Sequence, residues 1–357
     1  MAVHFHPLIV KEVKKETQDC VSIVFEIPVN LKDEFQFTQG QNVTLKTNID
    51  GEDIRRSYSI CSAPFENELR VAVKKVDGGK FSSYANEVLK RNDVMDVMPP
   101  TGKFNTTLHK ENTKKYVAFA AGSGITPIIS LIKATLTTEA HSSFTLAYSN
   151  RSRGSIIFFE QLEGLKNKFV ERFNFIHLLS KERTEATINF GRIDTAKLAQ
   201  LSPLINYEKI DEFFICGPHE MIFCVKDFLE NKSIASSKIH FELFTTPGQK
   251  ENLHITEIIN SNVLKSKVTI KLDGRSVAFD LAFENESILD AALKQGADLP
   301  FACKGGVCAT CRAKLIEGEV TMKVNYALEP EEVAQGFILT CQAHPLTENV
   351  LIDFDVK

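Results

Sequence analysis

The stretch PFACKGGVCATC, which spans residues 300–311, decides how the rest of the chain is interpreted. Its cysteines Cys303, Cys308 and Cys311 follow the spacing C-x4-C-x2-C, and Cys341 comes after a longer gap. Four thiolates in this spacing are suited to hold a [2Fe–2S] cluster. The two glycines between the first cysteines let the loop turn sharply and bring its N–H groups toward the sulfurs. The stretch therefore predicts a cluster held by these four cysteines.

Zinc is the alternative metal for such a cysteine set, because soft thiolates bind zinc as well as iron–sulfur clusters. Zinc sites usually combine two C-x2-C units, whereas this chain has one such unit preceded by a four-residue gap. The spacing therefore favours the iron–sulfur cluster, and a structural zinc ion or unrelated core cysteines are the competing interpretations. The other cysteines, Cys20, Cys61, Cys216 and Cys224, are expected mostly as small buried hydrophobic residues.

Length and charge limit the classes of function. A chain of 357 residues is too long for one core and predicts two or three domains. Its net charge is −4, and no basic stripe suggests a nucleic-acid partner. The residues from Lys265 onward hold 10 Lys or Arg and 14 Asp or Glu, so the net charge lies there. This segment could steer toward a basic partner surface, although small domains are often acidic by chance.

The chain shows no sign of a membrane segment or a signal peptide. The first ten residues, MAVHFHPLIV, lack a basic region and a cleavage-like end. The apolar run Tyr116–Leu136 contains Pro127, Lys133 and two glycines, and it divides into strand, loop and helix. We therefore expect a cytoplasmic protein without a membrane partner.

The pattern of the first 110 residues predicts an antiparallel β-barrel domain. Short β-branched runs alternate with turn-forming residues, and one helix is expected from Ser82 to Leu89. The expected strands contain CVSIVFEI, NVTLKT, SYSICS and LRVAVKKV.

Residues 111–247 change to an alternation of strands and helices, which predicts a parallel sheet covered on both faces. Helices are expected from Pro127, over residues 156–169, and from Pro218 or His219. Residues 248–264 are predicted as a linker. Residues 265–357 then suggest a β-grasp domain with a helix over Ser287–Gln295, a hairpin around Glu317–Gly318, and a final strand pair containing ILTCQA and NVLIDF.

Two motifs of the barrel domain suit a flavin nucleotide. Arg56 and Tyr58 lie two residues apart on an expected strand, so a guanidinium and a phenol ring share one face. In the second motif, Gly79 opens a helix near Ser82, and the first N–H groups of a helix bind phosphate oxygens. The competing interpretations are a surface arginine beside a core tyrosine, and an ordinary serine N-cap.

The α/β domain carries two motifs for a dinucleotide. Gly122, Gly124, Thr126 and Pro127 form a turn between a strand and a helix, where glycines allow close approach to a phosphate. The next strand leads to SNRSR, residues 149–153, where arginine rather than an acid favours a 2′-phosphate. Arg151 and Arg153 therefore predict NADPH over NADH, and a solvated basic loop is the alternative. A third motif, Cys216-Gly217-Pro218, ends a later strand and is compatible with a plain strand-to-helix turn.

These motifs, R-x-Y-S, G-x-x-S, G-S-G-I-T-P and C-G-P-x-x-M in this order, resemble the ferredoxin–NADP reductase superfamily. The cysteine loop resembles plant-type ferredoxins. The order of flavin domain, nicotinamide domain and C-terminal ferredoxin domain is similar to the one-chain reductases of multicomponent oxygenases. This resemblance covers nearly the whole chain and leaves out the linker.

The resemblance implies roles for the matching residues. Arg56 would contact the FAD pyrophosphate, Tyr58 would stack on the flavin ring, and Ser59 would lie near flavin N5. Ser82 would meet the pyrophosphate, Thr126 and Cys216 would flank the nicotinamide, and Arg151 would meet the 2′-phosphate. Phe244 is implied to cover a flavin face. Ser59 and Cys216 are accordingly the catalytic candidates.

The implied activity is electron transfer from NADPH through FAD and the [2Fe–2S] cluster to an oxygenase partner, of the di-iron type. In such a protein the cofactors carry the chemistry, and the chain orients and tunes them. An FMN- or FAD-dependent reductase of a Rieske or steroid hydroxylase system is one alternative. A non-catalytic electron-carrier subunit that has lost its flavin is another.

Overall fold

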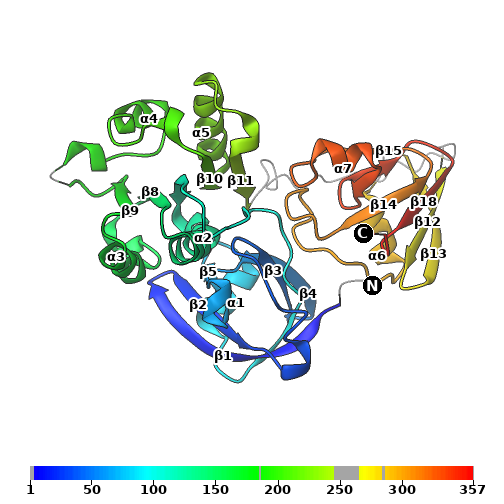
Figure 1. The fold of residues 1–357 in the computed structure, drawn as a ribbon. Helices are drawn as coiled ribbons and strands as arrows, with labels where there is room; N and C mark the ends of the chain where they lie inside the picture. Colours follow the sequence, from blue (N-terminus) through cyan, green and yellow to red (C-terminus); the bar gives the residue numbers. More distant parts are fainter. Residues whose placement is uncertain (1–3, 185, 245–264, 284–285, 357) are drawn as a thin grey trace. The chain divides into compact units, whose positions relative to one another are not determined.

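The computed structural model describes residues 4–184, 186–244, 265–283 and 286–356 (Figure 1). The chain forms two compact units, one of which is Phe5–Phe244. We describe this unit and the C-terminal unit, residues 265–356, separately. The predicted linker 248–264 lies outside the described residues. None of the helices in these ranges is both long and apolar enough to cross a membrane.

The first unit begins with a barrel lobe, residues 5–104, built on a six-stranded antiparallel sheet. The strand order is β4-β3-β6-β1-β2-β5, and a bridge between Ile60 and Val71 brings the two edges together, as the predicted barrel requires. Alternate β-branched and apolar side chains such as Val43, Leu45 and Val71 fill the interior. The strands are β1 (His6–Thr17), β2 (Cys20–Glu26), β3 (Asn42–Ile49), β4 (Glu52–Ser59), β5 (Leu69–Lys74) and β6 (Val94–Val97).

The helix of this lobe, α1 (Lys80–Glu87), starts two residues earlier than the sequence predicts. Gly79 occupies the N-cap position in an extended conformation. The Ser82 hydroxyl accepts a hydrogen bond from the Val76 N–H at 3.0 Å and donates to the Gly79 carbonyl at 3.2 Å. Ser82 therefore lies inside the helix and holds the preceding turn, which is why the predicted start at Ser82 is wrong.

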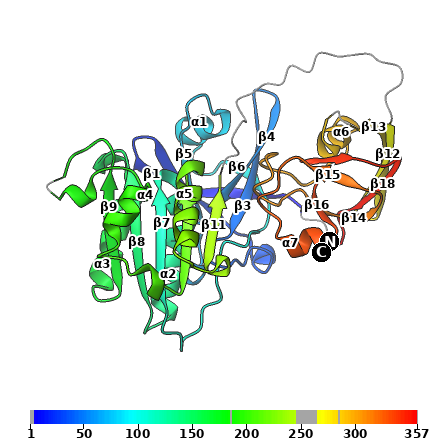
Figure 2. The same ribbon diagram turned by 90° about the horizontal axis from the view of Figure 1, so that it is seen from above.

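The α/β lobe, residues 115–244, contains a five-stranded parallel sheet in the order β11-β10-β7-β8-β9. Its strands are β7 (Lys115–Ala121), β8 (Ser143–Asn150), β9 (Phe173–Leu179), β10 (Glu212–Gly217) and β11 (Ile239–Leu243). Its helices are α2 (Ile125–Thr138), α3 (Phe159–Lys168), α4 (Thr195–Leu201) and α5 (His219–Asn231). In Figure 1, α4 and α5 cover one face of the sheet and α2 and α3 the other, as predicted for a parallel sheet. Figure 2 shows β9, β8 and β7 side by side, and β11 at the other edge of the sheet beyond β10.

Two helix boundaries of this lobe differ from the prediction. Helix α2 begins at Ile125 instead of Pro127, so Pro127 lies in its first turn, where its missing N–H costs no hydrogen bond. Helix α3 begins only at Phe159, because Phe158 has a left-handed φ of 61° and ends the preceding loop. Ile156 and Ile157 were expected in that helix, but they are buried in the loop instead.

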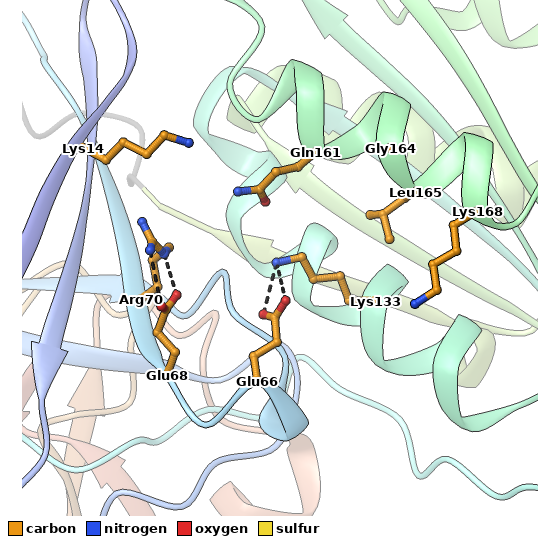
Figure 3. Close-up of a pocket in the computed structure, with 9 residues that line it drawn as sticks. All are labelled: Lys14, Glu66, Glu68, Arg70, Lys133, Gln161, Gly164, Leu165 and Lys168. Atoms are coloured by element: carbon orange, nitrogen blue, oxygen red, sulfur yellow. Dashed lines mark hydrogen bonds and ion pairs between the residues drawn. The ribbon is translucent and has the colours of Figure 1, made fainter.

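The two lobes share a hydrophobic core and polar contacts. Cys61 and Phe104 of the barrel lobe belong to the same buried cluster as helix α2. The Ser130 hydroxyl donates to the Ser62 carbonyl at 2.6 Å, and Lys133 forms an ion pair with Glu66 at 3.1 Å. Figure 3 shows this pair in an open cavity of about 320 Å³ between the lobes, where Arg70 also pairs with Glu68. The lobes are therefore fixed to one another.

A buried carboxylate anchors the segment that connects the lobes. Glu139, fully buried after α2, accepts hydrogen bonds from the side chains of Asn112 at 2.6 Å, Tyr116 at 3.0 Å and Ser142 at 2.7 Å. It also accepts the backbone N–H of His109 at 3.2 Å. A buried carboxylate with four donors is well compensated, and its removal leaves all four without an ionised acceptor.

We therefore expect Glu139→Gln to lower the free energy of unfolding by about 3 kcal/mol, since the new amide places a donor against existing donors. Chemical denaturation measures this loss. The exposed Glu111→Gln removes a nearby charge and should leave the midpoint unchanged. An equal loss in both variants would assign the effect to general charge balance.

The C-terminal unit has a five-stranded mixed sheet in the order β13-β12-β18-β14-β16, with helix α6 packed against it. A second sheet pairs β15 with β17. The strands are β12 (Lys265–Leu272), β13 (Arg275–Ala282), β14 (Arg312–Glu317), β15 (Val320–Met322), β16 (Phe337–Leu339), β17 (Ala343–Pro345) and β18 (Asn349–Asp353). The helices are α6 (Ile288–Lys294), capped by Ser287, and α7 (Pro330–Ala334). A small sheet with one main packed helix agrees with the predicted β-grasp class.

Two strand pairings predicted in this unit are wrong. The strands on either side of Glu317–Gly318 form no hairpin, because β14 pairs with β16 and β18 while β15 pairs with β17. The last strands, β16 and β18, also do not pair, since β14 lies between them. Gly318 does form a turn, with φ of 85° and the Asn349 carbonyl 2.2 Å from where a Cβ would stand. The chain therefore turns at Gly318 as predicted, but this turn connects strands of two different sheets.

Candidate functional site

Strand β4 presents the predicted flavin-binding residues at the edge of the barrel. Arg56 is exposed, and its guanidinium donates to the Arg55 carbonyl at 2.7 Å. The Tyr58 ring packs on Phe81 of α1 with centroids 5.4 Å apart and planes inclined by 33°. Burial raises the pKa of Tyr58, so the phenol stays neutral. An exposed cation beside a fixed neutral ring is the combination that the sequence predicted for a flavin nucleotide.

The start of α1 is available to a phosphate through its backbone. Gly79 provides no side-chain cap for the first N–H groups of the helix. The Ser82 hydroxyl is already bonded to the Val76 and Gly79 backbone. In this geometry the N–H groups at the helix start are available as donors, and Ser82 supports the turn that presents them.

A contact that sequence reasoning missed joins the two lobes at the end of β4. The Ser59 hydroxyl donates to Oε2 of Glu242 on β11 at 2.8 Å, although the residues are 183 positions apart. Glu242 lies opposite Cys216 in the register of β10 and β11. Burial raises the pKa of Glu242 from its ordinary 4.5 to about 7, and hydrogen bonds from Ser59 and Asn42 oppose that rise. The signal in the sequence was an acid within the apolar strand IHFEL.

The turns after β7 and β10 approach each other backbone to backbone. A Cβ on Gly124 would lie 2.1 Å from the Cys216 carbonyl oxygen, so only glycine fits there. The Thr126 hydroxyl donates to the Ser123 carbonyl at 3.0 Å and stabilises its own turn. Cys216 is fully buried, and burial holds its pKa well above the ordinary value, so the thiol is neutral. These turns therefore lie in close backbone contact at the carboxyl edge of the sheet.

A cation from the barrel lobe faces this edge and was not predicted. The Nζ atom of Lys74 on β5 lies 3.9 Å from where a Cβ on Gly122 would stand. Lys74 also forms an ion pair with Asp19 at 3.5 Å. An ammonium group above a glycine turn with φ of 54° suits an anionic cofactor group.

The loops after β8 and β9 are joined through their backbones, and both loops carry exposed basic side chains. The N–H of Lys181 donates to the Arg151 carbonyl at 2.9 Å, which joins the two loops. Arg151 and Arg153 are exposed, and the Arg153 guanidinium stacks over the Phe159 ring at 4.9 Å. The loop after β9 also contributes an acid that the prediction did not include, because Oε2 of Glu182 accepts the Arg153 N–H at 2.8 Å.

The four predicted cluster ligands form two pairs in the C-terminal unit. Cys303 is hydrogen-bonded to Cys308, and Cys311 to Cys341. The first bond lowers the pKa of Cys308 and raises that of Cys303, so one sulfur of the pair favours the thiolate. Among the described residues, no three His, Cys, Asp or Glu side chains gather around one metal position. Two thiol pairs suit a two-iron centre, in which each iron would take two cysteine thiolates.

The loop around these cysteines directs backbone donors at the sulfurs. The Gly305 N–H donates to Sγ of Cys303 at 3.3 Å, and a backbone N–H of Gly306 reaches Cys341. Lys304, Gly306 and Ala309 have positive φ, at 52°, 75° and 52°. Gly306 and not Gly305 is thus the glycine that the loop conformation requires. N–H groups aimed at sulfur are the feature that tunes an iron–sulfur centre, so the residues present fit the group.

Phe244, the last described residue of the first unit, follows β11. Its side chain is 37% exposed, which is unusual for a phenylalanine. The structure thus leaves its ring accessible, but its predicted flavin contact stays a prediction.

Three known domain families match the chain in this order. Residues 7–106 match "Oxidoreductase FAD-binding domain", residues 119–227 "Oxidoreductase NAD-binding domain", and residues 270–346 "2Fe-2S iron-sulfur cluster binding domain". The cofactors of this oxidoreductase are therefore FAD, a nicotinamide nucleotide and a [2Fe–2S] cluster.

Full-length relatives have the same organisation. One subunit of the 1,2-phenylacetyl-CoA epoxidase of Escherichia coli is 45% identical over 99% of this chain and 98% of its own length. The ferredoxin reductase component of a 3-ketosteroid-9-alpha-monooxygenase from Rhodococcus rhodochrous is 31% identical over 97% and 96%. The structure of phthalate dioxygenase reductase has the same fold, with a TM-score of 0.60, 22% identity and 98% coverage of both chains. This chain belongs to the single-chain reductases of the ferredoxin–NADP reductase superfamily that carry a C-terminal [2Fe–2S] domain.

Proposed function

We propose that this protein transfers electrons from NADPH through FAD and a [2Fe–2S] cluster to an oxygenase component. The observation that carries the proposal is the meeting of Ser59, Glu242 and Cys216, which brings the barrel edge and the α/β edge to one point. When bound at this point, FAD would supply the acceptance of a hydride from NADPH and the release of single electrons, while Ser59, Glu242 and Cys216 border its position. A stopped-flow measurement of NADPH-dependent flavin bleaching and cluster reduction tests the proposal.

The residues of the chain bind and orient in this scheme. Arg56 and the N–H groups at the start of α1 hold the FAD pyrophosphate, and Tyr58 packs against the flavin ring. Ser59 and Cys216 border the position where the nicotinamide meets the flavin, and Thr126 shapes the turn beside it. Phe244 covers the flavin. Glu242 holds or releases a proton next to the reacting rings, within hydrogen-bonding distance of the Ser59 hydroxyl.

We propose the phenylacetyl-CoA epoxidase, with a di-iron oxygenase, as the partner system, acting in the cytoplasm during phenylacetate degradation. The 45% identity to a subunit of that epoxidase supports this choice above the other relatives. Reconstitution decides it: the purified protein should support NADPH-dependent epoxidation of phenylacetyl-CoA by the oxygenase subunits. Support of a Rieske or steroid oxygenase instead, with no epoxidation, would redirect the assignment.

The relative from Rhodococcus rhodochrous supports a steroid hydroxylase reductase as the second candidate. An FMN-based reductase of a Rieske system is the third candidate. Extraction of the flavin separates FAD from FMN. A non-catalytic carrier would show neither a flavin spectrum nor bleaching by NADPH. The buried Ser59–Glu242 contact argues against the carrier, because burial of this carboxyl is costly and a lost flavin site gives no reason to retain it.

The preference for NADPH rests on the charge around the loops after β8 and β9. Arg151, Arg153, Lys181 and Arg183 supply four cations for a 2′-phosphate. Glu182 is an acid in the same loops, and its carboxylate accepts the backbone N–H of Arg153. A free acid would favour the 2′-hydroxyl of NADH, so the balance of charges favours NADPH.

We expect the double substitution Arg151→Ala and Arg153→Ala to raise the KM for NADPH about ten- to hundredfold and leave that for NADH unchanged. Charge-assisted hydrogen bonds to a phosphate are worth about 1.5–3 kcal/mol each, and the 2′-phosphate is absent from NADH. Steady-state ferricyanide reduction with both nucleotides measures the ratio. Arg91→Ala, an exposed charge in the barrel lobe, is the control. An unchanged NADPH-to-NADH ratio in the double variant would exclude this site.

A further inference from the structure

Tyr148 is a buried tyrosine at the carboxyl end of β8 that no motif includes. Its side chain is fully buried, and its ring stacks near Phe175 with centroids 6.5 Å apart. Its hydroxyl donates to the Gly122 carbonyl at 2.8 Å. Burial keeps its pKa well above the ordinary value, so the hydroxyl is a permanent donor.

The carbonyl that Tyr148 contacts belongs to the turn predicted to meet the dinucleotide. Gly122 has a left-handed φ of 54°, and its carbonyl also accepts the Ile125 N–H that closes the short 3-10 turn. In a trans peptide the carbonyl and the N–H point in opposite directions. The Gly122 carbonyl points to Tyr148, so the N–H of Ser123 in the same peptide points away from Tyr148.

We propose that Tyr148 is a positioning residue for the nicotinamide cofactor. Its hydroxyl holds the Gly122–Ser123 peptide in one orientation, and the Ser123 N–H thereby faces the cofactor's pyrophosphate at the carboxyl end of the sheet. The inference rests on the proposed function, because it requires a dinucleotide at this turn. Without the hydroxyl, the Gly122 carbonyl keeps only the Ile125 N–H, and the peptide is held less firmly in this orientation.

The test is Tyr148→Phe in the full-length holoprotein, which removes the hydroxyl and keeps the buried ring. We expect the KM for NADPH to rise about three- to tenfold, the effect of one hydrogen bond, with a smaller change in kcat. The KM for NADH should rise by the same factor, because the pyrophosphate is common to both nucleotides. This equal effect distinguishes Tyr148 from the arginines of the 2′-phosphate loops.

Tyr116→Phe is the matched control. Tyr116 is equally buried on the neighbouring strand β7, but its hydroxyl donates to Glu139 at the opposite end of the sheet. Tyr116→Phe should lower thermal stability and leave both KM values unchanged. Unchanged KM values in Tyr148→Phe, or equal rises in both variants, would overturn the inference. Failure of the proposed function itself would look different, since the unmodified protein would then not oxidise NADPH.

Discussion

Cys308→Ser is expected to abolish electron delivery to cytochrome c or to an oxygenase while NADPH–ferricyanide activity is retained. Cys308 belongs to the first of the two thiol pairs, and its loss would leave one iron position with a single cysteine ligand. A serine hydroxyl does not replace a soft thiolate for iron. Ferricyanide accepts electrons from the flavin directly, so this activity requires only the first unit, residues 5–244.

Three measurements on the same preparation check this expectation. The reduced-state EPR signal should disappear, cytochrome c reduction should fall to background, and flavin bleaching by NADPH should keep its rate. Cys224→Ser is the matched control, because Cys224 lies on α5 and contacts Thr195 rather than another cysteine. Equal loss of ferricyanide and cytochrome c activity in Cys308→Ser would contradict a linear path through the cluster. A retained EPR signal would contradict the ligand assignment.

The order of domains and the gathering of Cys303, Cys308 and Cys311 in one loop were predictable because each depends on local chemistry. Cysteines at fixed spacing in a loop, and glycines between a strand and a helix, can be recognised within about ten residues of sequence. The pairing of Cys311 with Cys341 depends instead on how β16 is placed beside β14. The wrong hairpin at Gly318 has the same origin, since the turn is local but the choice of partner strands depends on burial across the whole unit.

The residues that sequence reasoning missed all act across long separations. Glu242 joins the site only because β11 lies beside β10, which brings the Glu242 carboxyl within hydrogen-bonding distance of Ser59 in the other lobe. Lys74 and Lys181 likewise approach their turns from neighbouring elements. An acid in an apolar strand was visible in the sequence, but its partner was not. Such contacts can be identified only once the fold is known, whereas the motifs beside them can be recognised in the sequence.

Glu242→Gln is expected to slow flavin reduction by NADPH at pH 8 about tenfold or more and to remove its pH dependence between pH 6 and 8. The nicotinamide ring becomes positively charged as it loses the hydride, and a nearby carboxylate stabilises that charge. With its pKa near 7, Glu242 is increasingly ionised as the pH rises, so the normal rate should rise through pH 7. The facing groups, Ser59, Asn42 and the neutral Cys216 thiol, carry no charge that titrates in this range.

The same substitution should make the protein more stable, and the sign follows from the raised pKa. Between pH 4.5 and 7 the unfolded chain releases the Glu242 proton while the folded chain keeps it, so stability falls as the pH rises. The loss amounts to roughly 3 kcal/mol above pH 7 and is absent below pH 4.5. Glutamine does not ionise, so the substitution removes this loss.

Denaturation of the holoprotein at pH 4.5 and pH 8, together with stopped-flow flavin reduction, measures both effects. Glu242→Gln should match the unmodified protein in stability at pH 4.5, exceed it at pH 8, and be slower there. Glu160→Gln, an exposed acid on α3, should change neither quantity. A variant that is slower but not more stable at pH 8 would mean that the carboxyl is ionised throughout this range. A variant that is more stable but equally fast would mean that the buried charge serves no step of hydride transfer. Because the two effects have opposite signs, a general disturbance of the fold cannot produce both.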